Sequence, residues 1–166
     1  MAGSRSVPDP RTPPIPESPM PLPYPGRLLA VDWGTLRLGI ACSDETQRLA
    51  SPLATLTRRS GRRFPMPRFL ALVAEQAPVG VVVGLPLSSE GNESAASAQA
   101  RELADLIARR TGLPVELYDE RLTTARALGV VRAQGGSTRG RKEDVDALAA
   151  AVLLQTYLDA RRGGHP

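Results

Sequence analysis

Residues 27–43 read RLLAVDWGTLRLGIACS, and this stretch sets the architecture of the chain. A continuous apolar run, typical of a strand buried on both faces, ends at the carboxylate of Asp32. Gly34 allows a tight turn, after which residues 36–43 form a second apolar segment. So short a connection joins antiparallel strands, so we expect the sheet to begin with a hairpin.

The rest of the chain extends the sheet and covers it with helices. Residues 49–56 predict a third antiparallel strand, and the β-branched run 79–83 predicts a buried fourth strand. Helices are expected at 68–76 after Pro67, from Asn92 or Ser94 to Arg110, from Thr123 or Thr124 to Gln134, and at 142–160, with a last strand at 115–118. This order predicts an α/β fold, a five-stranded mixed sheet with three antiparallel and then parallel strands, flanked by helices.

Composition divides the chain into a tail and one domain. Residues 1–26 hold nine of the 16 prolines, which fix φ and lack an N–H donor. We therefore expect a disordered tail at 1–26 and one domain at 27–162, a length that suits a single core.

Several classes of protein are excluded by what the chain lacks. With one cysteine, Cys42, and one histidine, His165, there is no disulfide framework and no zinc site of thiolates or imidazoles. A histidine-dependent triad would have to use His165, next to the C-terminus. No apolar run approaches the roughly 20 residues that cross a bilayer, and no signal peptide is recognisable. We expect a cytoplasmic protein without a membrane partner.

The charge balance points to a polyanionic partner. The net charge is +4 and the pI is about 10.0. No acid occurs between Glu45 and Glu75, whereas six arginines do: Arg48, Arg58, Arg59, Arg62, Arg63 and Arg68. They predict a phosphate-binding surface, with a solvated loop as the alternative. Because aromatic residues make up only 4%, a platform for stacking bases is not expected.

Carboxylates supply the candidate chemistry. Asp32 ends one buried strand, Asp119 and Glu120 end another, and Asp146 lies beside the apolar stripe of the last helix. Buried carboxylates are costly unless paired or bound to a cation, and oxygen ligands suit Mg²⁺ or Mn²⁺. The alternative is that Asp32 caps the turn at Gly34, Asp119 pairs with a neighbouring arginine, and Asp146 faces solvent.

Four segments in order resemble a known family. They are D-x-G-T-x-R-x-G-I-A-x-S-D at 32–44, VVGLPL at 82–87, DERLTT at 119–124 and K-x-x-x-D-A-x-A-A at 142–150. The chain resembles the YqgF, or RuvX, family of Holliday junction resolvases and pre-16S ribosomal RNA nucleases, over about residues 27–160.

The resemblance implies a ribonuclease-H-like fold and hydrolysis of phosphodiesters with two Mg²⁺ or Mn²⁺ ions roughly 4 Å apart. It assigns Asp32 as the bridging ligand, Glu120 as the second acid and Asp146 as the helical acid, with Asp119 as a substitute for Glu120. In related resolvases the second acid follows the strand equivalent to 79–83, where this chain has Gly84-Leu85-Pro86. We expect the nucleic-acid backbone to be held by basic side chains: Arg37, Arg58, Arg59, Arg62, Arg63, Arg121 and Lys142.

Structured RNA on the 5′ side of pre-16S ribosomal RNA is the expected substrate, and a four-way DNA junction is the alternative. Junction resolution needs two coordinated cuts, so a homodimer stays open as the assembly. A phosphotransferase of the actin and sugar-kinase type shares the D-x-G-T loop but needs two domains, and a non-catalytic nucleic-acid-binding scaffold is the other rival. The glycine-rich loop 135–140 is expected to order on nucleic acid.

Overall fold

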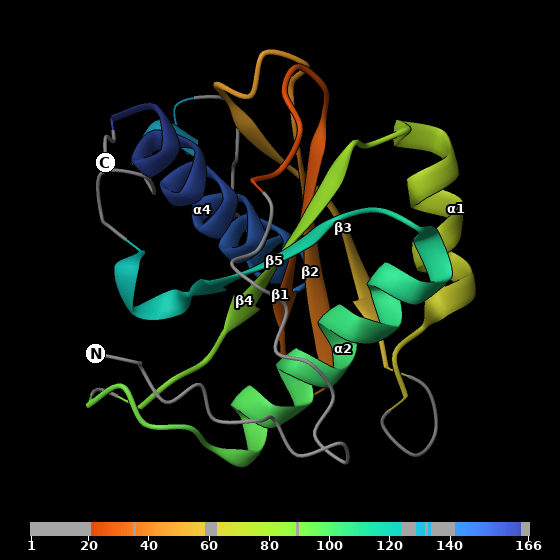
Figure 1. The fold of residues 1–166 in the computed structure, drawn as a ribbon, viewed down its shortest axis with the longest axis vertical. Helices are drawn as coiled ribbons and strands as arrows, with labels where there is room; N and C mark the ends of the chain where they lie inside the picture. Colours follow the sequence, from red (N-terminus) through yellow and green to blue (C-terminus); the bar gives the residue numbers. More distant parts are fainter. Residues whose placement is uncertain are drawn as a thin grey trace, which may run out of the picture.

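The computed structural model describes residues 21–34, 36–58, 63–88, 90–123, 129–131, 133 and 142–163, with 142–144 described by backbone alone. Within these residues lie five strands and three helices of more than ten residues (Figure 1). The strands are β1 (Leu28–Trp33), β2 (Arg37–Ser43), β3 (Ala50–Thr57), β4 (Gly80–Leu85) and β5 (Val115–Asp119). The helices are α1 (Met66–Gln76), α2 (Ala95–Thr111) and α4 (Lys142–Gly163), with a 3₁₀ turn at Glu120–Leu122.

The strands form one mixed sheet in the order β3-β2-β1-β4-β5. β1 pairs antiparallel with β2, and β2 with β3, whereas β4 runs parallel to both β1 and β5. This arrangement confirms the predicted three antiparallel strands followed by parallel ones. It places β1 in the centre of the sheet, where the sequence has its most apolar strand.

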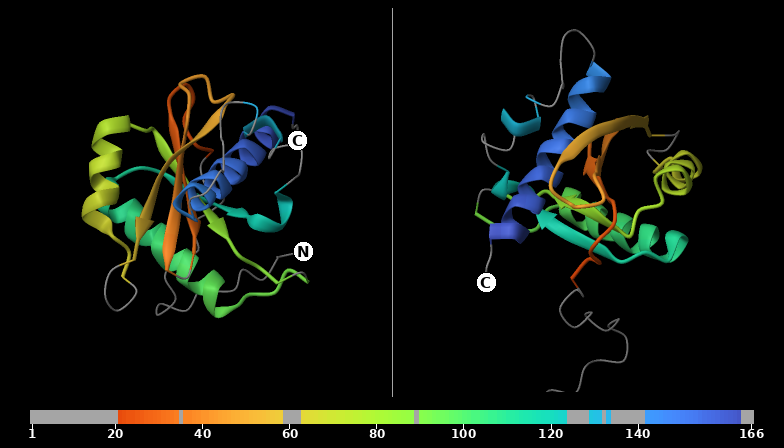
Figure 2. Two further views of the ribbon diagram at one scale, coloured as in Figure 1. Left: turned by 180° about the vertical axis from the view of Figure 1, so that it is seen from behind. Right: turned by 90° about the horizontal axis from the view of Figure 1, so that it is seen from above.

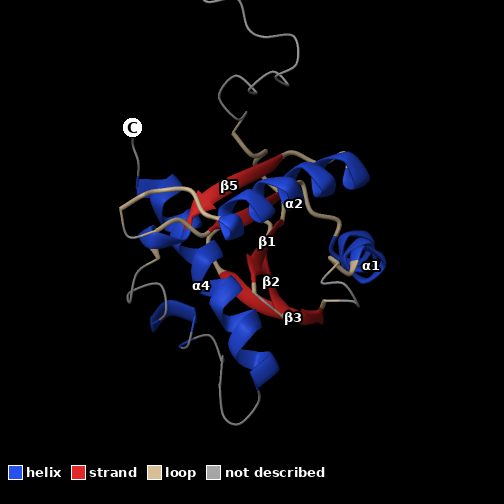
Figure 3. Cartoon of the chain, turned by 90° about the horizontal axis from the view of Figure 1, so that it is seen from below, coloured by secondary structure: helices blue, strands red, loops and turns tan. Residues whose placement is uncertain are grey.

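Helices cover both faces of the sheet. α4 packs on one face, against Leu28, Ala30 and Val82, and α1 and α2 pack on the other, against Leu29, Val31 and Val83 (Figure 3). Because successive residues of a strand point to opposite faces, β1 and β4 each serve both layers (Figure 2). None of the helices that the structure describes is both long and apolar enough to cross a membrane.

The helix ends follow local chemistry. The hydroxyl of Ser94 accepts a hydrogen bond from the N–H of Ser97, and that of Ser97 accepts one from the N–H of Ser94, so α2 starts with a capping box. The predicted cap at Ser94 is thereby confirmed. α1 begins at Met66, two residues earlier than predicted, because proline is tolerated in the first turn of a helix and Pro67 lies there.

The packed domain begins before Arg27. Leu22 is buried in the core under α4, and the side chain of Gln47 donates to the carbonyls of Pro23 at 2.7 Å and Gly26 at 2.9 Å. The guanidinium of Arg161 also donates to the carbonyl of Leu22. The predicted boundary at residue 27 is therefore too late, because the proline content of this segment concealed one apolar anchor.

Two expectations fall largely outside the described residues. Of the predicted helix from Thr123 or Thr124 to Gln134, the structure describes helical backbone at 129–131 and 133, preceded by the 3₁₀ turn. The predicted loop at 135–140 lies outside the described part of the chain.

Candidate active site

Asp32 lies near the end of the central strand, on the face that α4 covers. Leu28 and Ala30 pack into the core beneath α4, so the alternation along β1 directs Asp32 to the same side. Asp32 pairs across β2 with Gly39, and the parallel register with β4, which matches Val31 to Val83, puts Gly84 at its other side. The carboxylate is thus flanked by two residues without side chains.

Each of these glycines makes room for one of the other acids. A Cβ at Gly39 would lie 1.8 Å from the backbone oxygen of Asp146, so α4 touches β2 here backbone to backbone. A Cβ at Gly84 would lie 2.5 Å from Oε1 of Glu120. Glu120 therefore reaches from the end of β5 over β4, into the space that Gly84 leaves free.

Asp32 and Glu120 form a hydrogen-bonded carboxyl pair. Two ionised carboxylates at this separation repel each other, so the arrangement favours the protonated form of Glu120. Burial, the hydrogen bond with Asp32 and the charge of Asp32 raise the pKa of Glu120 to about 8. Burial also raises the pKa of Asp32, and the charge of Asp146 adds to that effect.

Asp146 is held by a neighbouring arginine rather than by the other acids. Nε of Arg37 lies 3.0 Å from Oδ2 of Asp146, at the distance of an ion pair. The angles do not make it a hydrogen bond, and Oδ2 of Asp146 is a buried atom without a hydrogen-bond partner. Asp146 is therefore partly exposed with one oxygen turned inward, and its charge acts on Asp32 from outside the Asp32–Glu120 pair.

A cavity of about 350 Å³ opens beside the carboxyl pair, lined by Asp32, Glu120, Thr123, Ala149, Val152 and Leu153. Oε1 of Glu120, like Oδ2 of Asp146, is buried without a hydrogen-bond partner, which is costly unless a cation satisfies it. A divalent cation fits this donor set because the atoms are hard oxygens. Within the described ranges, no three Asp, Glu, His or Cys side chains already stand as a metal-binding group.

Asp119 caps the 3₁₀ turn at Glu120–Leu122 and does not line the cavity. Its carboxylate accepts hydrogen bonds from the backbone N–H and guanidinium of Arg121, with Nη2 at 2.6 Å from Oδ2, and these lower its pKa. The alternative pairing of Asp119 with a neighbouring arginine is thus what the structure shows. This arrangement favours Glu120 as the second acid.

The predicted basic residues separate into three locations. Arg37 pairs with Asp146, and Arg121 pairs with Asp119. Arg58 and Arg63 line a groove that also involves Trp33 and the α2 side of the sheet, so they do not surround the carboxylates. The other three expectations, Arg59, Arg62 and the side chain of Lys142, lie outside what the structure describes.

Gly39 and Gly84 are the functional positions that sequence reasoning missed. A glycine inside a strand often marks a close approach by another part of the chain. That signal was present at both positions, but it does not say which residue approaches.

The comparisons with known proteins agree with this geometry. The sequence model of the RuvX family, described as Holliday junction resolvase, matches residues 26–160. The chain belongs to the RuvX family. Membership makes it a hydrolase that acts on nucleic acid.

RuvX relatives from several bacteria carry one name, "Putative pre-16S rRNA nuclease". The protein from Corynebacterium glutamicum is 43% identical over 84% of this chain and 81% of its own length. That from Anaeromyxobacter sp. is 44% identical over 81% of this chain and 98% of its own length. Each of these relatives matches more than four fifths of this chain.

Solved structures show the same fold. Thermus thermophilus RuvC in complex with a Holliday junction substrate is 22% identical with a TM-score of 0.56, covering 82% of this chain and 96% of RuvC. The yeast mitochondrial Holliday junction resolvase Ydc2 has a TM-score of 0.50 at 9% identity, covering 83% of this chain and 80% of Ydc2. Both confirm the predicted ribonuclease-H-like fold.

Proposed function

We propose that this protein is a divalent-metal-dependent endonuclease that processes the 5′ side of pre-16S ribosomal RNA. The observation that carries the metal dependence is the buried Asp32–Glu120 pair, with an unpartnered oxygen on Glu120 and a pKa of about 8. An acid that holds a proton at neutral pH in an empty site can exchange it for a cation. Family membership argues against both the phosphotransferase and the scaffold.

Asp32, Glu120 and Asp146 would hold the Mg²⁺ or Mn²⁺. When bound, such ions supply Lewis-acid chemistry for phosphodiester hydrolysis and stabilise charge on the leaving oxygen. Asp32 projects from the rigid central strand, Glu120 loses its proton, and Arg37 keeps Asp146 oriented. The apolar wall of Ala149, Val152 and Leu153 lowers the local dielectric and so strengthens these electrostatic contacts.

The choice of RNA rests on the relatives, which are named for pre-16S rRNA and match most of the chain. A processing nuclease needs one site and a basic surface, which the three carboxylates and the arginines of this chain would supply. Ribosomal RNA processing would place the protein in the cytoplasm. The second candidate, resolution of a four-way DNA junction, is favoured by the description of the family model.

The deciding experiment compares turnover on a pre-16S leader fragment and on a mobile four-way junction at one salt concentration. Each substrate is incubated with Mg²⁺, with Mn²⁺ and with chelator, and the oligomeric state is measured alongside. We expect cleavage of the RNA that the chelator abolishes. Paired symmetric nicks in the junction by a stable dimer that ignores the RNA would replace the first candidate with the second.

A further inference from the structure

A second hollow lies on the face of the sheet opposite to the carboxylates. It is a groove of about 620 Å³ between the end of β1, the end of β3 and α2. Trp33 and Asp32 are consecutive in β1, so their side chains leave the strand on opposite faces. We call this hollow the Trp33 groove; its described lining is Trp33, Arg58, Arg63, Phe64, Met66, Gln99, Glu102, Leu103, Leu106 and Arg110.

The centre of the Trp33 groove is an ordered aromatic–guanidinium pair. Cζ of Arg58 lies 3.9 Å from the centroid of the Trp33 ring. Nη1 of Arg58 donates to the carbonyl of Gly34 at 3.3 Å, and the indole N–H donates to Oε1 of Gln99 at 3.3 Å. Both planar groups are thus held in place from two sides, which lowers the entropic cost of binding a flat ligand against them.

The remaining walls combine apolar surface with positive charge. Met66 and Leu103 are buried, and the half-buried ring of Phe64 packs edge-on against Phe69 with centroids 5.3 Å apart. Three arginines face one acid, Glu102, so the groove carries two net positive charges. A flat apolar surface among cations complements a nucleotide, whose base is flat and whose phosphate is anionic.

We propose that the Trp33 groove binds a single unpaired nucleotide of the substrate strand, with its base against the Trp33–Arg58 pair and its phosphate near Arg63 and Arg110. This inference rests on the proposed nuclease function and names the substrate feature that the enzyme recognises. Low aromatic content does not predict a stacking site, but the fold needs only one indole and one guanidinium to build it.

A nucleotide bound in the groove would direct cleavage to unpaired regions. A strand that crosses the end of β1 meets Asp32 on one face and Trp33 on the other, one residue apart along the backbone. Only an unpaired base can turn its face toward a side-chain platform, because the faces of paired bases are stacked within a helix. The scissile phosphate is therefore placed close to an unpaired nucleotide, and a continuous duplex is bound less well.

Intrinsic fluorescence tests this directly because Trp33 is the only tryptophan of the chain. The full-length protein, in chelator to prevent cleavage, is titrated with a short single-stranded RNA, a duplex of the same sequence and inorganic tripolyphosphate. We expect the single strand to quench Trp33 with saturation. Equal quenching by the duplex or by tripolyphosphate would overturn the proposal, because it would show a surface for any polyanion.

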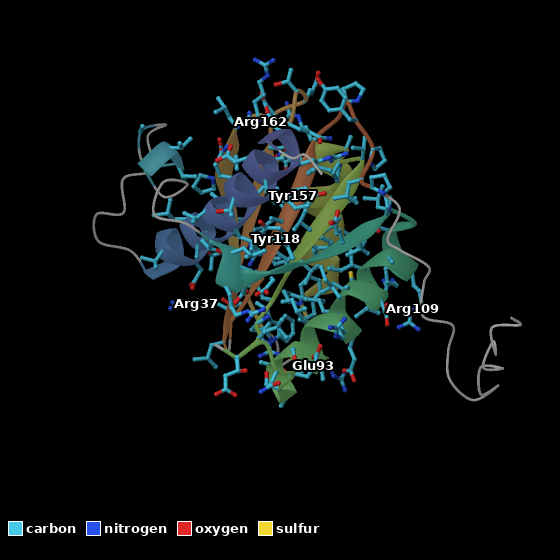
Figure 4. The ribbon with its side chains drawn as sticks, turned by 60° about the vertical axis from the view of Figure 1, so that its left-hand side comes forward. Arg37, Glu93, Arg109, Tyr118, Tyr157 and Arg162 are labelled. Atoms are coloured by element: carbon cyan, nitrogen blue, oxygen red, sulfur yellow. The ribbon has the colours of Figure 1, made fainter. Side chains whose placement is uncertain are left out.

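Charge at the groove is tested by two neighbouring arginines of α2. Arg110 lines the groove, whereas Arg109 is exposed on α2 outside it (Figure 4). We expect Arg110→Ala to weaken binding of the single strand severalfold and to lower the salt slope by about 0.7, as for one lost phosphate contact. Arg109→Ala removes the same charge from the same last turn and is expected to bind as the wild type. Equal effects of the two variants would contradict the proposal.

Stacking is tested by a substitution that keeps the charge. Arg58→Lys retains a cation but loses the planar guanidinium, so we expect binding to fall about fivefold or more, as when one base loses its stacking partner. For Arg110→Lys, which keeps the charge near the phosphate, binding of the single strand is expected to fall less than twofold. If both lysine variants bind the single strand as the wild type does, the groove acts only as a basic patch and the stacking proposal is wrong.

Failure of this inference is distinguishable from failure of the nuclease assignment. A protein that cleaves RNA but shows none of these binding differences loses the groove and keeps its activity. A protein that shows the quenching and the Arg110 effect but never cleaves keeps the groove and loses the assignment.

Discussion

Buried polar groups are hydrogen-bonded near one end of α4 and lack hydrogen-bond partners near the other. Toward its C-terminal end, Oε1 of Gln155 accepts from the N–H of Ala50 at 2.8 Å, and its amide donates to the carbonyl of Arg48 at 2.9 Å. Gln47 likewise donates to two carbonyls and accepts from Arg161. Toward the N-terminal end, Glu120 and Asp146 each keep a buried oxygen without a hydrogen-bond partner.

The difference separates structure from function within one layer of the fold. Satisfied amides at the Gln155 end attach the helix to the edge strand and to residues 22–26, and so contribute stability. Tyr118 of β5 and Tyr157 of α4 pack edge to face between the strand and the helix, with centroids 5.5 Å apart (Figure 4). The buried carboxylate oxygens at the other end lack hydrogen-bond partners, which costs stability and is the arrangement expected of the proposed cation site.

The largest expected effect is loss of cleavage on removing the central carboxylate. Asp32→Asn should lower the single-turnover rate at least a thousandfold, equivalent to about 4 kcal/mol, while the fold is retained. Asp105→Asn makes the same chemical change at an exposed site on α2 and should cleave normally. If Asp32→Asn cleaves at the wild-type rate, the carboxylates near the N-terminal end of α4 do not have the functional role that the comparison gives them.

The next effect is on stability, at the other end of α4. Gln155→Leu leaves the N–H of Ala50 buried without its partner and removes one of the two donors to the carbonyl of Arg48, so the free energy of unfolding should fall by about 1–3 kcal/mol. Denaturant unfolding measures this, and cleavage per folded molecule should be unchanged. Gln99→Leu, which loses one exposed hydrogen bond, should change stability by less than about 0.5 kcal/mol. Similar losses in both variants would show that Gln155 is not the special anchor.

A third effect is the pH dependence of stability without metal. Glu120 keeps its proton in the folded state up to a pKa of about 8, whereas the unfolded value is 4.5. Its contribution is thus fully present below pH 4.5 and is lost as pH rises through 8. In chelator, Glu120→Gln should be more stable than the wild type by about 1–2 kcal/mol at pH 8.5 and about equal at pH 4.

Thermal or denaturant unfolding of both proteins across this pH range checks the prediction. Mg²⁺ should reduce the wild-type slope because it binds the ionised carboxylates of the folded state. If the free energies of unfolding of the wild type and Glu120→Gln differ by the same amount at every pH, the raised pKa of Glu120 is contradicted.

The smallest effect is expected at the neighbouring acid. Asp119 is paired with Arg121 at a solvent-accessible position, where ion pairs contribute little, so Asp119→Asn should change stability only slightly and change the cleavage rate less than about threefold. Unfolding and single-turnover assays measure both quantities. If Asp119→Asn is inactive while Glu120→Gln cleaves, the second acid is Asp119 and the comparison must be redrawn around it.

Local pattern was enough for the strands, the helices and the positions of the three acids. Apolar runs and turn residues have short-range causes, so β1, β4 and the cap at Ser94 could be read from the chain. Packing across long sequence separations decided the rest. Leu22 looked like part of a proline-rich tail until α4 and Gln47 were seen around it, 24 residues or more away along the chain.

The roles of individual charges also depended on the three-dimensional neighbours. That Asp32 raises the pKa of Glu120, that Arg37 pairs with Asp146, and that Arg58 lies over Trp33 follow from which strands and helices adjoin. A residue's pKa and its hydrogen-bond partners depend on burial and on atoms within a few ångströms, and a linear sequence specifies neither. Gly39 and Gly84 illustrate this difference. The sequence shows two strand positions without a side chain, and the fold brings the backbone of Asp146 and the side chain of Glu120 into the space at those positions.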